Sequence, residues 1–326
     1  MKNNLIKFIK STILLLGIIS FFVACQDTTK TKKEAKVTTP YFKLSLAQWS
    51  VHKQIIKGKL DPVDFAEKAK SLGFEGLEYV SQLYTNYLKK GDDPKIAMQS
   101  LLDTLKIKSE KFGMQNIGIM IDNEGDLASP NEKERLQGVE NHKKWIDACA
   151  FLGGQYVRVN LFGSDDSAVW VAQSVKSLKA LAEYAKDKNI NVIVENHGYL
   201  SSNTPELIKV MKDVAMSNCG VLPDFGNWCL KREGGKRWDT KCIEEYDRYL
   251  GVKGMIPYAK AVSAKSYDFN EAGDETLIDY YKMLQIVKDG GYKGYVGIEY
   301  EGNRLSEEEG IIATKKLVLK AAKQLK

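Results

Sequence analysis

The sequence has few of the residues that build common thiolate and imidazole metal sites. Only three histidines occur among 326 residues, and the five cysteines include no CxxC pair. Thiolate zinc sites usually combine four cysteine or histidine ligands at such short spacings, so the sequence argues against one. Cys229 and Cys242 could pair as a disulfide in an oxidising compartment, although buried free thiols explain them equally well.

An excess of charge of one sign is also missing from most of the chain. The sequence has 48 basic and 42 acidic residues, and seven of the basic but only two of the acidic ones lie in residues 1–40. Residues 41–326 are therefore nearly neutral. Such a domain has no basic footprint for phosphates, so we expect no nucleic-acid partner.

No apolar run is long enough for a membrane-spanning helix. A bilayer needs about 20 consecutive apolar residues, whereas the run that follows three early lysines covers only residues 13–23. Basic residues followed by a short apolar run are typical of a signal peptide, which we place at residues 1–24.

The end of this leader suggests a lipid anchor. Phe22-Val23-Ala24-Cys25 resembles a bacterial lipobox, in which Cys25 would be acylated and become the mature N-terminus, although leucine is usual where Phe22 stands. If Cys25 is acylated, residues 25–40 are the lipidated cysteine and a flexible Thr- and Lys-rich tether. The alternative is a simple secretory leader cut nearby. We expect a protein of the bacterial cell envelope, held by its acyl chains on a periplasmic or outer-surface membrane face.

Residues 41–326 alternate short β-like runs with longer amphipathic stretches. Eight such units occur, as parallel βαβ architecture requires. No glycine-rich phosphate turn follows the first predicted strand, which disfavours the alternative of a doubly wound open sheet. We therefore predict a single-domain (β/α)8 TIM barrel. Its predicted strands are 43–48, 74–79, 114–121, 155–161, 190–195, 220–224, 261–265 and 295–299. Its predicted helices are 62–72, 93–112, 132–152, 168–187, 205–217, 240–258, 275–289 and 307–325.

Three of the predicted strands end in an acidic residue, namely Glu195, Asp224 and Glu299. Neighbouring strands lie about 4.8 Å apart, and the site of such a barrel is at the carboxyl ends of its strands, so these carboxylates can converge. Clustered negative charges repel unless they share a proton or hold a cation. We therefore predict a divalent metal site whose oxygen ligands favour Mg²⁺ or Mn²⁺ over zinc. The alternative for any one of these acids is a position on the surface.

The seventh predicted strand adds a cation to this group. Side chains alternate along a strand, so Ser263 and Lys265 point into the barrel if Val262 and Ala264 face the helices. A partly desolvated lysine beside carboxylates could act as an electrophile or, if its pKa falls, as a base. Alternatively, the ammonium only neutralises the carboxylates, or it replaces a metal.

Further polar and aromatic side chains are expected around the same mouth. Arg158 and Asn160 face inward by the alternation on the fourth strand, and Gln48 and Glu78 end the first two strands. Polar groups beside an aromatic platform suit a polyol, although a single aromatic is more often part of the packing. His142 falls on a polar helical face and is expected to be solvated. The predicted substrate-binding residues are Gln48, Trp49, His52, Glu78, Arg158, Asn160, His197, Asn227 and Trp228.

The segments that carry these residues resemble the sugar phosphate isomerase/epimerase superfamily, the xylose isomerase-like TIM barrels. The resemblance covers residues 41–326. Its main segments are Leu46-Ala47-Gln48-Trp49-Ser50, Gly73-Phe74-Glu75-Gly76-Leu77-Glu78, Val194-Glu195-Asn196-His197, Asp224-Phe225-Gly226-Asn227 and Gly294-Tyr295-Val296-Gly297-Ile298-Glu299.

The resemblance implies a set of metal ligands that this chain matches only in part. Members of the family typically bind a divalent metal through a glutamate after strand five, an aspartate after strand six, a histidine on strand seven and a glutamate after strand eight. Glu195, Asp224 and Glu299 match the first, second and fourth positions, but Ser263 stands where the family usually has the histidine of a His-x-Lys motif. This departure from the family leaves two alternatives: a metal held more weakly by the three carboxylates, with or without His197, or a site that works without a tightly bound metal.

The resemblance also implies a reaction. Glu195 and Glu299 would flank a carbonyl-bearing sugar and move a proton next to the carbonyl, with Lys265 or the metal as the electrophile. Return of the proton gives an isomerase or epimerase, and loss of a β-substituent gives a lyase or dehydratase. Because a protein outside the cytoplasm rarely meets sugar phosphates, we expect its substrate to be a free sugar, a keto-sugar or a keto-glycoside and not a phosphorylated sugar.

Two other functions are weighed against this reaction. A non-catalytic carbohydrate-binding lipoprotein that has lost a metal ligand at Ser263 is the main alternative. An endonuclease IV-type repair enzyme of the same superfamily is disfavoured, because its zinc cluster needs several histidines.

Overall fold

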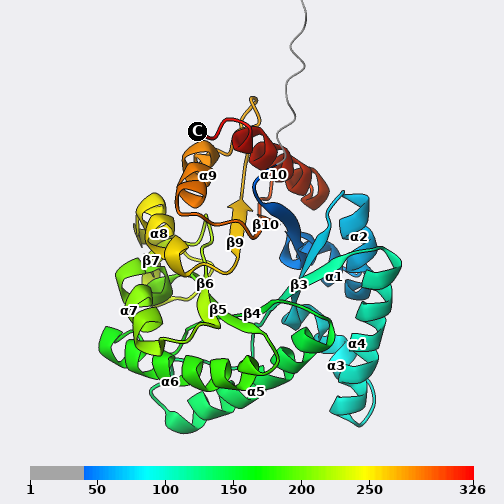
Figure 1. The fold of residues 1–326 in the computed structure, drawn as a ribbon, viewed down its shortest axis with the longest axis vertical. Coiled ribbons are helices and arrows are strands. Elements are labelled where there is room, and N and C mark those ends of the chain that lie inside the picture. Colours follow the sequence, from blue (N-terminus) through cyan, green and yellow to red (C-terminus); the bar gives the residue numbers. More distant parts are fainter. Residues whose placement is uncertain (1–39) are drawn as a thin grey trace, which may run out of the picture. The chain divides into compact units, whose positions relative to one another are not determined.

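The computed structural model describes residues 40–326 (Figure 1). The predicted signal peptide and the predicted lipidation of Cys25 lie outside the described residues and remain predictions. Within residues 40–326, no helix combines the length and the apolarity needed to cross a bilayer.

Eight parallel strands form one curled sheet, and the predicted TIM barrel is confirmed (Figure 1). The order across the sheet is β6-β5-β4-β3-β2-β1-β10-β9, so sequential strands are neighbours except where β10 pairs with β1. The strands are β1 (Lys43–Ala47), β2 (Gly76–Val80), β3 (Gln115–Met120), β4 (Tyr156–Val159), β5 (Asn191–Glu195), β6 (Cys219–Leu222), β9 (Val262–Ser266) and β10 (Tyr295–Tyr300).

A short seam between β6 and β9 closes the ring. Isolated parallel bridges join Val221 to Ala259 and Asp224 to Ser263. The Ser263 backbone contributes twice to this seam, because its N–H donates to the Pro223 carbonyl at 3.0 Å and its carbonyl accepts from Phe225 N–H at 3.1 Å. Two of the predicted site residues, Asp224 and Ser263, therefore lie on the seam itself.

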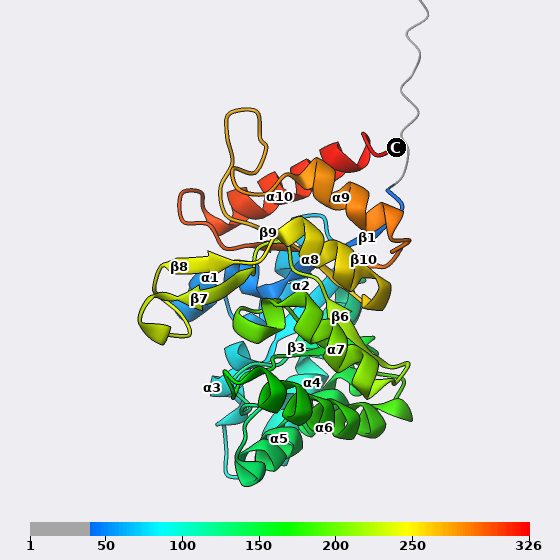
Figure 2. The ribbon, with the colours of Figure 1, turned by 90° about the vertical axis from the view of Figure 1, so that its left-hand side faces the viewer.

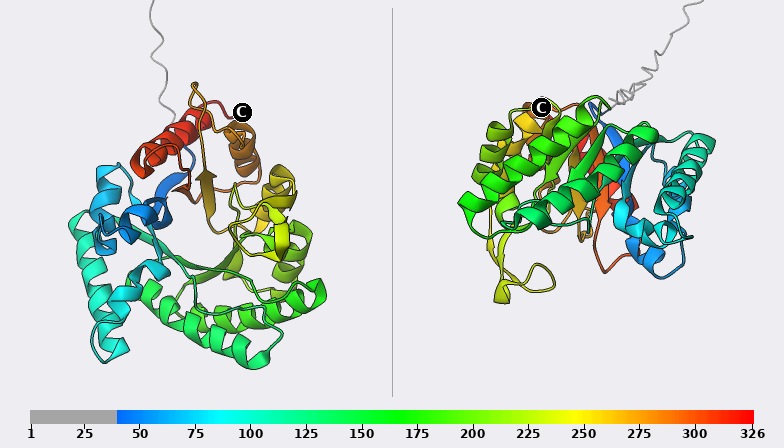
Figure 3. Two further views of the ribbon diagram at one scale, coloured as in Figure 1. Left: turned by 180° about the vertical axis from the view of Figure 1, so that it is seen from behind. Right: turned by 90° about the horizontal axis from the view of Figure 1, so that it is seen from below.

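Helices cover the outer face of the ring in Figures 1 and 3. They are α1 (His52–Ile56), α2 (Phe65–Ser71), α3 (Thr85–Leu88), α4 (Pro94–Lys111), α5 (Glu132–Phe151), α6 (Ser167–Lys186), α7 (Thr204–Val214), α8 (Arg248–Met255), α9 (Tyr280–Asp289) and α10 (Glu307–Ala322). Short 3-10 turns lie at η1 (Gln48–Val51), η2 (Pro62–Asp64), η3 (Ser81–Tyr84), η4 (Tyr199–Ser202), η5 (Glu233–Gly235) and η6 (Ile256–Tyr258).

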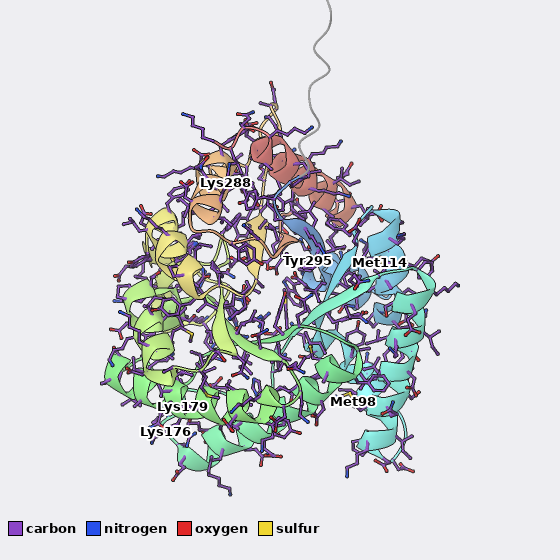
Figure 4. All side chains as sticks on the ribbon, viewed as in Figure 1. Met98, Met114, Lys176, Lys179, Lys288 and Tyr295 are labelled. Atoms are coloured by element: carbon purple, nitrogen blue, oxygen red, sulfur yellow. A yellow bond between two sulfur atoms is a disulfide. The ribbon has the colours of Figure 1, made fainter. Side chains whose placement is uncertain are left out.

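Alternation along the strands separates two hydrophobic layers. Outward residues such as Val157 and Val159 are fully buried between the strands and the helices, and burying a side chain of this size contributes about 1.5–3 kcal/mol. A smaller cluster, which includes Tyr156 and Ile193, fills the inside of the barrel, and Tyr295 at the start of β10 packs against it (Figure 4). The inward positions nearer the carboxyl ends are left for polar side chains.

One predicted helix is wrong over its first eight residues. Residues 240–258 were expected to be helical, but β8 (Cys242–Glu245) pairs antiparallel with β7 (Cys229–Arg232), and this hairpin projects from the barrel in Figure 2. A disulfide joins Cys229 to Cys242, with 5.8 Å between their Cα atoms. This pairing holds residues 242–245 extended, and α8 starts only after Asp247, whose side chain caps it.

A second predicted helix also starts late. Residues 275–279 were expected to be helical, but α9 begins at Tyr280. The Glu275 carboxylate instead accepts hydrogen bonds from four backbone N–H groups of the surrounding loop, at 2.5–3.3 Å. Those bonds favour the loop over a further helical turn.

Candidate functional site

A cavity of about 670 Å³ opens at the carboxyl ends of the strands. Its walls include the strand-end acids Glu195 and Glu299, together with Glu301 just beyond β10. The substrate-binding residues predicted from sequence that line it are Trp49, Arg158, Asn160, His197 and Asn227. This is the rim at which active sites of such barrels lie.

Three buried carboxylates meet at one point of this rim. Glu195, Asp224 and Glu299 each place one oxygen within 4.8 Å of the others, and all three side chains are buried. They come from the end of β5, the segment after β6 and the fifth residue of β10. Their convergence agrees with the expectation from the strand order, and such a group could hold a metal ion.

The Ser263 hydroxyl lies between two of these carboxylates. It donates to Asp224 Oδ2 at 2.6 Å and lies 3.1 Å from Glu299 Oε2. A hydroxyl carries one proton, so the second contact is a hydrogen bond only when a carboxyl is protonated. Burial raises the pKa of Asp224 to about 7 and that of Glu299 well above its usual range, although Lys265 acts against both shifts. Shared protons therefore relieve part of the repulsion.

Lys265 supplies a buried positive charge to the same cluster. Its Nζ lies 2.9 Å from Glu301 Oε1, 3.5 Å from Glu299 Oε1 and 4.0 Å from Asp224 Oδ2. Burial alone would lower the pKa of Lys265, but the surrounding carboxylates outweigh burial and raise it well above its ordinary value. This direction favours a protonated Lys265, so of the expected roles it supports the electrophile or the neutralising cation and not the base.

The donor set fits a hard divalent cation. Three carboxylate oxygens lie within 4.8 Å of one another, with the Ser263 hydroxyl bonded to one of these carboxylates, and oxygen ligands of this kind suit Mg²⁺ or Mn²⁺. The Lys265 ammonium lies within 4.0 Å of two of the same carboxylates, so it competes with a metal for their charge.

Glu195 is oriented by two side chains. Arg158 Nε lies 2.9 Å from Glu195 Oε2, and Asn227 Nδ2 donates to Glu195 Oε1 at 3.0 Å. The Arg158 guanidinium also pairs with Asp122, Nη1 to Oδ1 at 2.8 Å. Burial would raise the pKa of Asp122, but Arg158 outweighs burial and lowers it. Asp122 was missed from the sequence, although it follows β3 as the other acids follow their strands.

A chain of hydrogen bonds continues from Asp122 to His197. Asn160 Nδ2 donates to Asp122 Oδ1 at 2.7 Å, which leaves Asn160 Oδ1 to accept from His197 Nδ1 at 2.8 Å. This assignment puts the proton of His197 on Nδ1. Burial lowers the pKa of His197, so its ring is neutral and Nε2 is an acceptor.

Four predicted substrate-binding residues do not line the cavity. Gln48 is fully buried and bonds Tyr84 Oη at 2.8 Å and the Val80 N–H at 3.0 Å. Glu78 lies inside the barrel and accepts from Ser45 Oγ at 2.5 Å. The side chains of these two residues form buried hydrogen bonds within the barrel and do not face a ligand.

The other two of these four are an aromatic and a histidine. Trp228 is 1% exposed, and its indole N–H donates to the Phe225 carbonyl at 3.1 Å. His52 stacks on Trp49 with 4.2 Å between the ring centroids. Trp228 is therefore a core residue, and His52 supports Trp49 from outside the cavity.

His142 corrects a further expectation, because it is buried and not solvated. Its Nδ1 lies 2.7 Å from the Gly138 carbonyl, and its side chain reaches the cavity wall. Other cavity residues missed from the sequence lie in loops, where periodicity gives no orientation, or at the end of β7 in the case of Arg232: Phe162, Tyr267, Arg232, Arg237 and Trp238.

Comparisons with known structures find barrels of the same architecture. The apo 3-keto-D-glucoside 4-epimerase of E. coli has a TM-score of 0.59 at 15% identity, covering 79% of this chain and 94% of its own. The D-psicose 3-epimerase of Clostridium cellulolyticum H10, solved with D-tagatose, has 0.59 at 16%, covering 86% and 96%. The zinc-binding IolI protein has 0.60 at 15%, covering 86% and 98%.

At these identities the structures show a shared fold and no more. Among curated protein sequences, none is similar enough to count as a relative. A family model, described as the xylose isomerase-like TIM barrel, matches residues 66–322, which is most of the chain. The chain therefore belongs to the xylose isomerase-like TIM barrel family.

Proposed function

We propose that this protein moves a proton next to the carbonyl of a keto-sugar, as an isomerase, epimerase or lyase. The observation that carries the proposal is the meeting of Glu195 and Glu299 on one cavity, with a buried cation beside them. The structural neighbours named as a 3-keto-D-glucoside 4-epimerase and a D-psicose 3-epimerase support this reaction class.

The two glutamates are in different environments, which assigns them different roles. Glu195 is oriented by Arg158 and Asn227 and acts as the base that removes the proton on the carbon next to the carbonyl. The electron pair of the broken C–H bond moves into the carbon skeleton and places negative charge on the carbonyl oxygen. Glu299, whose pKa burial raises, carries a proton and delivers it to the other position or face.

Positive charge near the developing oxyanion lowers the energy of this intermediate. The Lys265 ammonium lies 3.5 Å from Glu299, which lines the cavity, although Lys265 itself does not. A divalent metal held by Glu195, Asp224 and Glu299 would polarise the carbonyl when bound. Arg158, Asn160 and His197 present hydrogen-bonding groups along the wall, which suits the hydroxyls of a small carbohydrate.

The Ser263 contacts favour a second candidate, a carbohydrate-binding protein without turnover. Ser263 bonds to Asp224 where the family usually has a metal-binding histidine, so the carboxylates are satisfied without a metal. In that case sugars would bind, but neither the wild type nor a Ser263→His variant would convert them.

A screen of keto-sugars by NMR separates the two candidates. D-tagatose, D-psicose and 3-keto-glucosides would be incubated with the wild type, Glu195→Gln and Glu183→Gln, each with and without chelator. Glu183 is an exposed acid on α6 and serves as the matched control. We expect product from the wild type and the control, and a rate lower by at least about a hundredfold in Glu195→Gln. Equal rates in all three proteins would contradict the proposed role of Glu195.

We also propose that the protein is anchored in the bacterial cell envelope through Cys25. The support is the lipobox-like segment Phe22-Val23-Ala24-Cys25 and the tether that follows it. Metabolic labelling with an alkyne fatty acid should mark the wild type and not Cys25→Ala. Equal labelling of the two would overturn this proposal, whereas absence of label with a cleaved leader would indicate simple secretion.

A further inference from the structure

The β7–β8 hairpin brings side chains to the cavity that the barrel itself does not supply. It is inserted at the seam between β6 and β9, and the Cys229–Cys242 disulfide closes its base. Arg232, Arg237 and Trp238 of this hairpin line the cavity. Figure 2 shows the hairpin projecting from the barrel.

Trp238 is part of an aromatic wall that continues from the carboxylate site. Its ring centroid lies 5.0 Å from that of His197 and 5.8 Å from that of Phe162, edge to face with Phe162. His197 is bonded to Asn160, which belongs to the chain of contacts that reaches Glu195. The wall therefore runs from the reacting centre to the hairpin, and Trp238 keeps 41% of its surface exposed.

The hairpin tip is held across the mouth of the cavity. Arg237 Nη2 lies 3.2 Å from Asp126 Oδ2, in the segment that follows β3. The same guanidinium lies 4.3 Å above the ring of Phe162. The Tyr199 hydroxyl donates to the Lys236 carbonyl. These contacts hold the two residues that precede Trp238, which lowers the cost of ordering its ring.

The cavity is larger than one sugar ring requires. A volume of about 670 Å³ equals that of roughly 22 water molecules at about 30 Å³ each. A hexose has about twelve non-hydrogen atoms, so a second ring can enter with the first.

We propose that Trp238 and the β7–β8 hairpin form a second subsite. In a disaccharide whose first ring lies at the carboxylates, this subsite stacks on the second pyranose ring. This inference rests on the proposed function for the ring that reacts at the carboxylates. The C–H face of a pyranose packs on an indole, and the indole N–H and the Arg232 guanidinium can bond its hydroxyls. The enzyme would therefore act on one ring of a glycoside and recognise the other through the hairpin.

Calorimetric titration with defined sugars tests the second subsite. Glucose, cellobiose, laminaribiose and maltose would be titrated into the wild type, Trp238→Ala and Ile243→Ala. Ile243 is 50% exposed on β8 and does not line the cavity, so it controls for hairpin damage. We expect at least one disaccharide to bind the wild type and Ile243→Ala about tenfold more tightly than glucose. That ratio should fall to about one in Trp238→Ala, a loss equivalent to about 1.4 kcal/mol.

The outcomes separate the subsite from the reaction. A wild type that binds no disaccharide more tightly than glucose, or an unchanged ratio in Trp238→Ala, would overturn the subsite even if keto-sugars are converted. A ratio that is lost in Trp238→Ala, without turnover of any keto-sugar, would support the subsite and overturn the proposed reaction.

Discussion

Lys265 shows how one side chain decides the chemistry of its surroundings. It is 1% exposed and forms ion pairs with Asp224 and Glu299 of the buried carboxylate cluster and with Glu301. The inward direction of Lys265 could be predicted from the sequence, because side chains alternate between the two faces of a strand. The sign of its pKa shift could not be predicted, because burial and the carboxylates act in opposite directions and only their distances decide the result.

Removing this cation should destabilise the protein mainly at alkaline pH. In Lys265→Met, the buried carboxylates lose their partner, and breaking a buried pair costs about 3–5 kcal/mol. Acid pH reduces the loss because the carboxyls can then take up protons. Thermal unfolding at about pH 5 and about pH 8 measures this difference. Lys179→Met on the surface of α6 is the control, and a Tm loss independent of pH in Lys265→Met would contradict the account.

Glu78 predicts a second pH effect, away from the cavity. Burial raises its pKa to about 7 from 4.5. Between these values the folded protein keeps a proton that the unfolded chain releases, so the free energy of unfolding contributed by this group falls as the pH rises towards 7.

A neutral side chain at this position should remove that part of the pH dependence. Glu78→Gln should therefore lose less stability than the wild type between about pH 5 and about pH 7.5 in urea unfolding. If the free energy of unfolding depends on pH in the same way in the two proteins, the pKa of Glu78 is not raised by burial.

At the scale of elements, the strands were predictable and the insertion at β6–β9 was not. Alternating or continuous apolar runs place strands within a few residues, and the same rule predicts that Arg158 and Asn160 face inward. Residues 240–258 look helical in sequence, but pairing with β7 and a disulfide override that preference at 242–245. Trp228 and Trp238 lie in or beside the same insertion, and no periodicity tells which of them is buried and which reaches the cavity.

The disulfide should stabilise the hairpin locally. Closing a loop of this size contributes up to about 3 kcal/mol, but the hairpin projects from the barrel, so its opening need not unfold the rest. In Cys229→Ser with Cys242→Ser, trypsin should cut between residues 230 and 241 at least about tenfold faster, with little change in the Tm of the barrel.

Mass spectrometry of the fragments locates the cuts in this experiment. As an internal check, reduced wild type and the double variant should be cleaved at the same rate, because both lack the disulfide. Cleavage at the same rate in oxidised wild type and double variant would show that the disulfide does not hold the hairpin.

At the scale of the whole molecule, closure of the ring is what makes the site. Glu195, Asp224 and Glu299 are distant in sequence, and the barrel brings their oxygens within 4.8 Å. This convergence follows from strand order alone and was therefore predictable. Asp122 obeys the same rule, whereas Phe162, Tyr267 and Trp238 depend on loop conformations that a single sequence does not specify.

The same convergence predicts that divalent cations stabilise the fold. A metal that binds only the folded protein raises its stability by about 2.7 kcal/mol at a concentration of about 100 Kd. Mn²⁺ or Mg²⁺ should therefore raise the Tm of the wild type and leave that of Asp224→Asn unchanged, as differential scanning fluorimetry can measure. A wild-type Tm that does not respond to either ion would indicate that Lys265 and shared protons balance the carboxylates without a metal.

The most direct test of the account is solvent deuterium incorporation by wild type and Glu299→Gln in D₂O, followed by NMR on a converted keto-sugar. The account predicts a product that carries deuterium at the position to which Glu299 delivers its proton, and loss of this deuterated product in a Glu299→Gln variant whose circular dichroism is unchanged. Conversion by the wild type without deuterium in the product, or deuterated product formed by Glu299→Gln at the wild-type rate, would contradict proton delivery by Glu299.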